Sequence, residues 1–342
     1  MVQACSGRKG SDMGRNLKME FVSELRRQKD YISGQELCSR FQISRTMVWK
    51  IMNQLKEEGY QIEAVTNRGY RLLQSPDVVT MEEITSVLRT KWLGKKVLYY
   101  DTTDSTNLRA KEAAEAADSH GLLIIADSQE AGRGRRGRNW ACEKGEALAM
   151  SFVLKPRLAC DKLSMITLLA AVAVSRAIER VSGLANAIKW PNDIVIHGRK
   201  VCGILTEMST QEDYVNHVVV GIGVNVNTAH FPEEIKDMAG SLFMESGKRV
   251  KRAELAAAIL EEFETIYEQF EQTENLSFLQ EEYNHKLVNI GKDIKVVSHD
   301  GERKGCSGGI NETGELYVTF EDGTRELVYS GEVSVRGLYG YI

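Results

Sequence analysis

The chain has 342 residues, of which 42% are apolar and 27% charged, and this composition predicts a globular protein of two or three domains. Residues 1–76 carry thirteen Lys and Arg against eight Asp and Glu, whereas the remainder carries 31 against 40, a distribution typical of a nucleic-acid-binding module joined to an enzyme. The six cysteines are scattered, with no C-x-x-C pair and no histidine cluster beside them, which argues against structural zinc and a disulfide framework and favours a reducing compartment.

Residues 1–16 are small, polar and basic, and we expect a disordered tail there, because the apolar stretch of a signal peptide is missing. The longest apolar run, between Lys162 and Arg176, is shorter than the roughly 20 residues that a membrane span needs. This run predicts a buried helix. We therefore expect a cytoplasmic protein with no membrane partner.

Three helices are predicted within residues 17–75. The first covers residues 18–27, and its apolar residues share one side. Ser33 and Glu36 have the S-x-x-E form of a capping box, which starts the second helix. Ser44 is placed to cap the third helix, in which apolar residues recur at i, i+3, i+4 and i+7: Val48, Ile51, Met52 and Leu55.

Residues 62–72 predict two short strands around Asn67-Arg68-Gly69, which is a hairpin signal. Three helices followed by a hairpin indicate a winged helix-turn-helix, in which the second helix of the pair enters the major groove. The alternative is a small helical protein-interaction domain, because any surface helix has polar residues opposite its apolar stripe. On the first interpretation, the residues expected to contact DNA are Arg45, Thr46 and Lys50 on the third helix and Arg68 on the wing.

A linker at residues 75–77 and a second capping box, Thr80 with Glu83, mark the start of a central domain that we place at residues 76–288. The strand predicted at residues 97–100 leads to the polar cluster Asp104-Ser105-Thr106-Asn107, where a helix is expected to begin. Polar side chains at a helix N-terminus often bind ligands. An ordinary helix cap explains the cluster equally well.

A glycine- and arginine-rich segment, residues 129–140, follows the buried strand predicted at residues 122–126. It contains G-x-G-x-x-G, but the apolar helix that a dinucleotide fingerprint needs after its glycines is missing. Tracts of the RGG type are usually disordered and repetitive, whereas this segment lies between two apolar strands. The remaining interpretation is a mobile loop that closes over a polyanion, with arginines neutralising phosphate and Trp140 stacking on a base.

Further along, polar residues recur among apolar ones. Lys189-Trp190-Pro191-Asn192-Asp193 surrounds a Trp-Pro turn, for which a purely structural Lys–Asp pair is one explanation. Lys200 is expected on a hairpin. The strand at residues 218–227 ends in glycines and asparagines, and glycines in a strand often mark a close approach to a ligand. Short strands with glycine turns then predict a small SH3-like β-barrel at residues 289–342.

Taken in order, the motifs D-S-T-N, Q-x-A-G-R-G-R-R-G-R-x-W, K-W-P-N-D, G-R-K-x-x-G-I-L-x-E and G-x-G-x-N-x-N resemble those of the biotin–protein ligases. With the helix-turn-helix in front, the chain is similar to the bifunctional subgroup that also acts as biotin operon repressor, the BirA family. The resemblance runs from about residue 18 to the end. It implies a mixed α+β fold: a winged helix-turn-helix, an α/β catalytic domain with a mixed sheet like that of class II synthetases, and an SH3-like domain.

The resemblance implies an ATP-dependent, AMP-forming ligase that makes biotinyl-5′-AMP from biotin and ATP with Mg²⁺, and then transfers biotin to a lysine of a biotin carboxyl carrier domain. It also implies repression of biotin genes at operator DNA by a homodimer that forms when the adenylate is bound. No metal held by protein ligands is expected. The residues matching those that bind biotin and the adenylate are Ser105, Thr106, Asn107, Gln129, Gly132, Arg133, Gly134, Arg135, Lys200 and Gly203. The residues matching those near the nucleotide are Trp140, Asn225 and Arg336.

Lys200, Arg135 and Asp193 are the catalytic candidates. Cations are needed because a carboxylate and a triphosphate repel each other. Asp193 either acts on the incoming acceptor lysine or orients Lys189, and the residues alone leave both roles open. Two other functions are weighed: a ligand-sensing transcription factor without catalysis, which the complete polar set argues against, and a lipoate ligase, which the arginine segment and the helix-turn-helix argue against.

Overall fold

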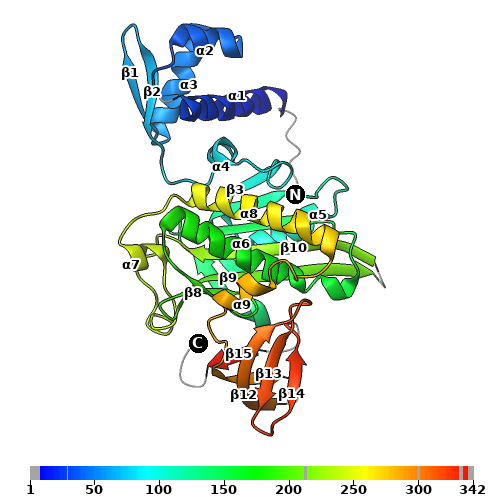
Figure 1. The fold of residues 1–342 in the computed structure, drawn as a ribbon. Helices are drawn as coiled ribbons and strands as arrows, with labels where there is room; N and C mark the ends of the chain where they lie inside the picture. The colour runs from blue at the N-terminus through cyan, green and yellow to red at the C-terminus, as the bar shows by residue number, and fades with distance from the viewer. Residues whose placement is uncertain (1–7, 29, 212–213, 299–300, 331–333, 338–342) are drawn as a thin grey trace. The chain divides into compact units, whose positions relative to one another are not determined.

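The computed structural model describes residues 8–28, 30–211, 214–298, 301–330 and 334–337 (Figure 1). The chain forms two compact units, one up to Leu88 and one from Arg89 onward.

The first unit is a helix-turn-helix with a two-stranded wing. Ser33 and Ser44 cap the second and third helices, since their hydroxyls accept hydrogen bonds from the N–H groups of Glu36 and Met47 at 3.1 and 3.2 Å. The apolar stripe predicted on the third helix is buried in one core with the apolar residues of the first. The elements of this unit are α1 (Arg8–Arg27), α2 (Gly34–Phe41), α3 (Arg45–Glu57), β1 (Gln61–Val65), β2 (Gly69–Gln74) and α4 (Met81–Val87).

Both ends of this unit differ from the sequence prediction. Helix α1 begins at Arg8, so residues 8–16 of the expected tail are helical, and residues 1–7 lie outside the described residues. Helix propagation gains one hydrogen bond per added residue, and no proline interrupts this stretch. At the other end, α4 belongs to the first unit instead of opening the next domain. The reason is Glu83, which is 1% exposed and binds Arg26 and the Tyr60 hydroxyl.

The second unit is built on a mixed sheet with the strand order β3-β4-β6-β10-β9-β8-β7. Strands β3 and β4 are parallel, and every other neighbouring pair on this path is antiparallel. The short strand β5 (Asn139–Cys142) pairs with β4. The other strands are β3 (Val97–Thr103), β4 (Leu123–Arg133), β6 (Ala147–Leu154), β7 (Ala187–Lys189), β8 (Asp193–Ile196), β9 (Arg199–Gln211) and β10 (Tyr214–Asn225).

Helices cover both faces of this sheet. Phe152 on β6 contacts Phe263 of α8 (Arg252–Thr273), with ring centroids 4.6 Å apart, whereas the neighbouring Val153 packs against α5 (Thr106–Ala114). Because successive strand residues point to opposite faces, α5 and α8 lie on opposite sides. Helix α6 (Met165–Ser182), the predicted buried helix, packs beside α8 (Figure 1). Two shorter helices are α7 (Leu242–Ser246) and α9 (Gln280–Lys286).

The C-terminal part is an antiparallel SH3-like sheet with the order β14-β13-β12-β11-β15. The Trp190 indole nitrogen donates to Gly314 O at 3.1 Å and so ties this part to the central sheet. None of the described helices is long and apolar enough to cross a membrane. The strands are β11 (Asp293–Ser298), β12 (Gly301–Ile310), β13 (Leu316–Phe320), β14 (Arg325–Val328) and β15 (Ser334–Gly337).

Candidate functional site

The centre of the mixed sheet carries small residues on the face that α5 covers. Ala149 on β6 pairs with Gly223 on β10, and Gly223 pairs with Gly203 on β9. Residues paired across neighbouring strands share a face, and Gly221 shares it too because it lies two residues before Gly223. We call these four residues the glycine floor. Their lack of side-chain bulk leaves room above the sheet.

Three predicted site residues from distant parts of the chain fill that room. A Cβ atom on the glycine beneath each would lie 1.9 Å from Asn107 Oδ1, 2.8 Å from the Trp140 indole and 2.9 Å from Lys200 Nζ. The strand glycines were expected to mark the approach of a ligand. They make room first for the chain's own side chains, which the floor brings together on one face of the sheet.

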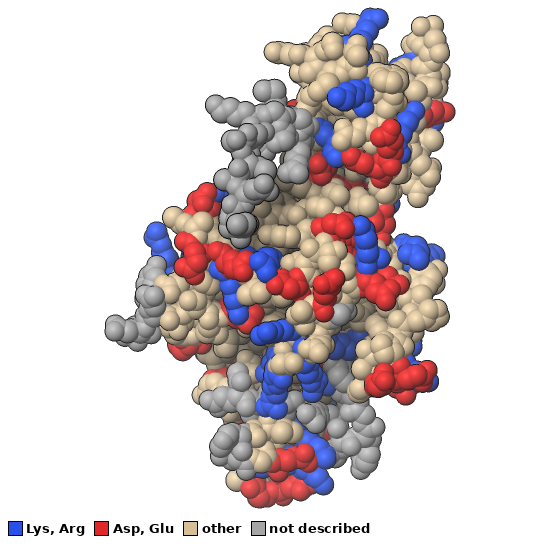
Figure 2. All heavy atoms as spheres, turned by 180° about the vertical axis from the view of Figure 1, so that it is seen from behind, with Lys and Arg blue, Asp and Glu red and all other residues tan. Residues whose placement is uncertain are grey.

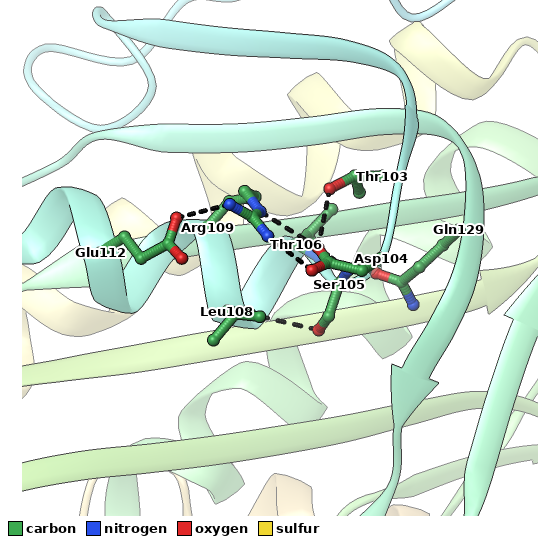
Figure 3. A network of polar contacts seen from close by, with 8 residues as sticks. All are labelled: Thr103, Asp104, Ser105, Thr106, Leu108, Arg109, Glu112 and Gln129. Carbon is green, nitrogen blue, oxygen red and sulfur yellow. Dashed lines mark hydrogen bonds and ion pairs between the residues drawn. The ribbon is translucent and has the colours of Figure 1, made fainter. Parts of the chain in front are cut away.

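The start of α5 adds a buried polar group to this face (Figure 3). Ser105 caps the helix. The backbone N–H and the hydroxyl of Thr106 both donate to Gln129 Oε1, at 2.8 and 3.2 Å. The Arg109 guanidinium and the N–H of Ser105 hold the pKa of the Asp104 carboxyl well below its usual range. The D-S-T-N motif therefore supplies a helix cap and, at the same time, buried polar groups beside the floor.

The arginine-rich segment is a hairpin. Strand β4 continues to Arg133, a 3-10 turn covers Arg135–Gly137, and β5 returns along β4. The loop predicted for residues 129–140 is therefore mostly strand, because β5 supplies backbone partners to residues 129, 132 and 133. Gly132 is needed for this close packing, since a Cβ there would lie 1.8 Å from Gln129 Nε2 and 2.2 Å from Trp140 O.

Two arginines of the turn contact the C-terminal sheet region. Arg135 donates to Asn192 Oδ1 at 3.1 Å and to Ser330 O, and burial lowers the pKa of its guanidinium. Arg136 donates to Val297 O at 3.1 Å. Arg133 is exposed and Gly134 half-buried. Figure 2 shows basic side chains gathered where the central and C-terminal parts meet, which gives this region a positive surface.

Lys200 and Asp193 form an ion pair at the edge of the glycine floor, with Nζ and Oδ1 2.6 Å apart. They lie on the neighbouring strands β9 and β8. Asp193 thus forms an ion pair with Lys200, a contact that was not expected from the sequence. The two roles considered from the sequence were acting on the acceptor lysine and orienting Lys189. Asn192, immediately before Asp193, donates to Ile204 O at 2.9 Å and is nearly buried.

The two remaining nucleotide candidates lie in different places. Asn225 ends β10 on the face of the glycine floor, and its Nδ2 donates to Gly240 O at 3.0 Å. Arg336 lies on β15, where its backbone pairs with Lys295 of β11. The Arg336 side chain is outside the described part of the structure. Asn225 therefore lies on the same face of the sheet as the glycine floor, whereas the backbone of Arg336 is part of the C-terminal sheet.

Some polar residues near the site were not predicted. Ser151 is fully buried in β6 and lies against Asn107 and Thr106. It is the single polar residue in ALAMSFVL, and that contrast was a usable signal. Glu207 ends the motif G-R-K-x-x-G-I-L-x-E but was given no role from the sequence, and its Oε2 accepts from Asn107 Nδ2 at 2.8 Å. Arg252, at the start of α8, forms a buried ion pair with Asp127 at 2.7 Å that no local pattern indicates.

In the first unit, the exposed face of α3 carries the predicted DNA contacts. Thr46 and Lys50 are exposed, and exposed Arg45 donates to Gln35 Oε1 at 2.9 Å. Trp49 lies on the same helix and is 61% exposed, an unusual state for a tryptophan. Trp49 is not among the residues that the sequence predicted to contact DNA.

The wing carries Arg68 in the β1–β2 turn. Its guanidinium lies 4.2 Å from the centre of the Tyr31 ring and 3.4 Å from Asp30. Gly69, with φ of +110°, allows the turn to pack on Ile32, because a Cβ there would lie 2.0 Å from Ile32 O. The wing is therefore held against the chain before α2, and the Arg68 side chain stays more than half exposed.

Comparisons with known proteins match both units. The HTH domain model matches residues 18–71, and the Biotin/lipoate A/B protein ligase family model matches residues 99–225. A bifunctional ligase/repressor BirA from Bacillus spizizenii is 38% identical over 308 residues, which cover 90% of this chain and 94% of the relative. The chain belongs to the BirA family of bifunctional ligase/repressors. The BirA of Escherichia coli is 28% identical over 308 residues.

A solved structure supports the same family fold. The biotin protein ligase from Aquifex aeolicus, in complex with biotin and ATP, is 31% identical with a TM-score of 0.63. The match covers 71% of this chain and 99% of that one. The predicted α+β fold, with a helix-turn-helix, a mixed catalytic sheet and an SH3-like sheet, is confirmed for this BirA-family chain.

Proposed function

We propose that this chain is a biotin–protein ligase that forms biotinyl-5′-AMP from biotin and ATP, transfers biotin to a lysine of an acceptor protein, and represses biotin genes by binding DNA. The observation that carries the proposal is the glycine floor with Asn107, Trp140 and Lys200 above it. One face of the sheet thus presents three kinds of group. The Asn107 amide can bind a polar ring, the Trp140 indole can stack on a base, and the Lys200 ammonium can bind an oxyanion.

The chemistry follows from charge. Joining a carboxylate to an α-phosphate brings two anions together, and at 4 Å such a repulsion is about 4 kcal/mol at an effective dielectric constant of ~20. We assign Lys200, Arg133 and Arg135 to offset it. Asp193 orients the Lys200 ammonium through their 2.6 Å ion pair. No protein nucleophile is needed, because the acceptor lysine itself attacks the mixed anhydride, so catalysis rests on positioning and charge stabilisation.

The remaining binding roles are proposals of the same kind. The substrate acid is assigned to the α5 start with Gln129 and Gly132, and to Gly134 and Gly203 along the hairpin and the floor. Trp140 is assigned to the adenine, since its indole already lies against Gly223. Asn225 and Arg336 are assigned to the nucleotide.

Mg²⁺ is proposed to arrive with the triphosphate. Within the described residues, no group of three or more His, Cys, Asp or Glu side chains could hold a metal ion. A divalent cation held mainly by substrate phosphates and water fits that arrangement, because Mg²⁺ often takes only one or two ligands from the protein.

The helix-turn-helix is proposed to bind a two-fold symmetric operator as a homodimer that forms when the adenylate is bound. Arg45, Thr46 and Lys50 would reach base edges, and Arg68 a phosphate. The biotin carboxyl carrier domain is the proposed acceptor, and the cytoplasmic location also remains a prediction.

Incubation of the full chain with biotin, ATP, Mg²⁺ and a biotin carboxyl carrier domain tests the enzyme, with mass spectrometry as the readout. We expect one biotinyl group on one acceptor lysine. A chain that binds biotin and DNA but modifies nothing would be a ligand-sensing transcription factor instead. Preferential consumption of lipoate in a parallel reaction would indicate a lipoate ligase.

A further inference from the structure

A chain of polar side chains connects the surface of α5 to the floor of the site. Lys111 Nζ lies 2.6 Å from Glu207 Oε1, and Asn107 Nδ2 donates to Glu207 Oε2 at 2.8 Å. The Ser151 hydroxyl then donates to Asn107 Oδ1 at 2.6 Å. Asn107 and Ser151 are buried and Glu207 is half-buried. Four side chains from three elements are thus linked, and Glu207 accepts from the neighbour on each side.

The same chain continues to Gln129. Ser151 Oγ lies 2.8 Å from Thr106 Oγ1, and Thr106 donates to Gln129 Oε1. The amide nitrogen of Gln129 therefore points away from Thr106 (Figure 3), against Gly132, where a Cβ would lie 1.8 Å from it. The orientation of the Asn107 amide thus depends on contacts within this chain, whereas Gln129 Oε1 is also held by the backbone N–H of Thr106.

Glu207, together with the more distant Leu205 O that accepts from Asn107 Nδ2 at 3.3 Å, decides the direction of the hydrogen bonds. A carboxylate only accepts, so Asn107 must turn its Nδ2 toward Glu207 and its Oδ1 toward Ser151. The Thr106 hydroxyl gives its one hydrogen to Gln129, so the one hydrogen of Ser151 is shared between Asn107 Oδ1 at 2.6 Å and Thr106 Oγ1 at 2.8 Å, with Asn107 the nearer acceptor. Two donors, Lys111 and Asn107, occupy the two oxygens of Glu207, and a glutamine would offer an acceptor to just one of them.

We propose that Glu207 is a positioning residue of the acid-binding pocket, which acts through Asn107 and Ser151 by fixing which polar atoms the start of α5 presents to the substrate. This inference rests on the proposed function, in which the pocket binds biotin. Misorienting a buried amide leaves a donor or an acceptor unpaired, and losses of this kind correspond to roughly tenfold weaker binding.

The test compares biotin affinity in two backgrounds, measured by calorimetry on the full chain. Glu207→Gln should raise the Kd for biotin about tenfold and change kcat by less than about threefold, because an interaction made equally in both states affects binding alone. Lys111→Met removes the competing donor, so the amide oxygen introduced by Glu207→Gln is then available to Asn107. In the Lys111→Met background, Glu207→Gln should therefore cost less than about threefold.

Lys96→Met is the matched control, because it breaks an exposed ion pair, with Asp118, and should leave biotin affinity unchanged. Ser151→Ala interrupts the chain without touching Glu207 and should weaken biotin binding by itself. Circular dichroism establishes that each variant is folded.

Unchanged biotin affinity in Glu207→Gln, or an equal loss in both backgrounds, overturns the inference and leaves the proposed function standing. An unmodified chain that neither binds biotin nor biotinylates the acceptor overturns the proposed function and this inference with it.

Discussion

Gly223→Ala probes the glycine floor directly. The added Cβ would lie 2.8, 2.9 and 3.1 Å from three atoms of the Trp140 indole, whereas ordinary contacts begin at about 3.4 Å, so the ring must move by about 0.6 Å. Overpacking of this kind costs about 1–3 kcal/mol in a closed core. Trp140 is half-buried and can yield, so we expect the lower end, near 1.4 kcal/mol, or roughly tenfold weaker ATP binding.

Calorimetry with ATP, with and without biotin, measures this effect, and the tryptophan emission spectrum reports movement of the ring. Gly34→Ala is the matched control, because its added Cβ would meet nothing closer than 3.8 Å and its φ is ordinary. Biotin affinity without ATP should change little, since Asn107 lies above Gly221 instead. ATP affinity within twofold of the unmodified chain would refute the placement of the nucleotide base against Trp140.

Three further predictions concern other parts of the chain. Arg45→Ala should weaken specific operator binding by about 1–3 kcal/mol in a fluorescence anisotropy titration and leave ligase activity intact; unchanged affinity would remove Arg45 from the interface. Arg135→Gly breaks the contacts with Asn192 and Ser330, so the adenylate should form but escape faster in a rapid-filtration assay, and unchanged retention would contradict the assignment. Asp127→Asn leaves Arg252 buried without its anion and should cost about 3–5 kcal/mol in urea unfolding, whereas a loss below about 1 kcal/mol would contradict the buried pair.

The local features of the fold could be predicted because their causes are local. Ser33, Ser44 and Thr80 cap helices where the sequence places them, since a cap needs just the next three residues. The same local rule misassigned α4. A capping box says that a helix begins and says nothing of which domain it packs against, and that was decided by the distant contacts of Glu83 with Arg26 and Tyr60.

Contacts across the second unit could not be read from the sequence. Trp190 and Gly314 are 124 residues apart, and the K-W-P-N-D pattern alone says nothing of the carbonyl that the indole meets. Strand β4 passes through residues that look like a loop, because pairing with β5 outweighs the weak strand preference of Gly132. The pairing of Asp193 with Lys200 depends on the register of β8 with β9, which the spacing of the two residues does not reveal.

The glycines illustrate how one pattern can serve a different physical purpose from the one it suggests. In a dinucleotide fingerprint, G-x-G gives a tight turn and lets a helix N-terminus approach phosphate. On β10, Gly221 and Gly223 are two residues apart in a regular strand and therefore open the same face of the sheet. What they admit is Asn107 and Trp140, from the chain itself. Because each glycine lies beneath a different side chain, substituting them one at a time should separate the binding of the acid from the binding of ATP.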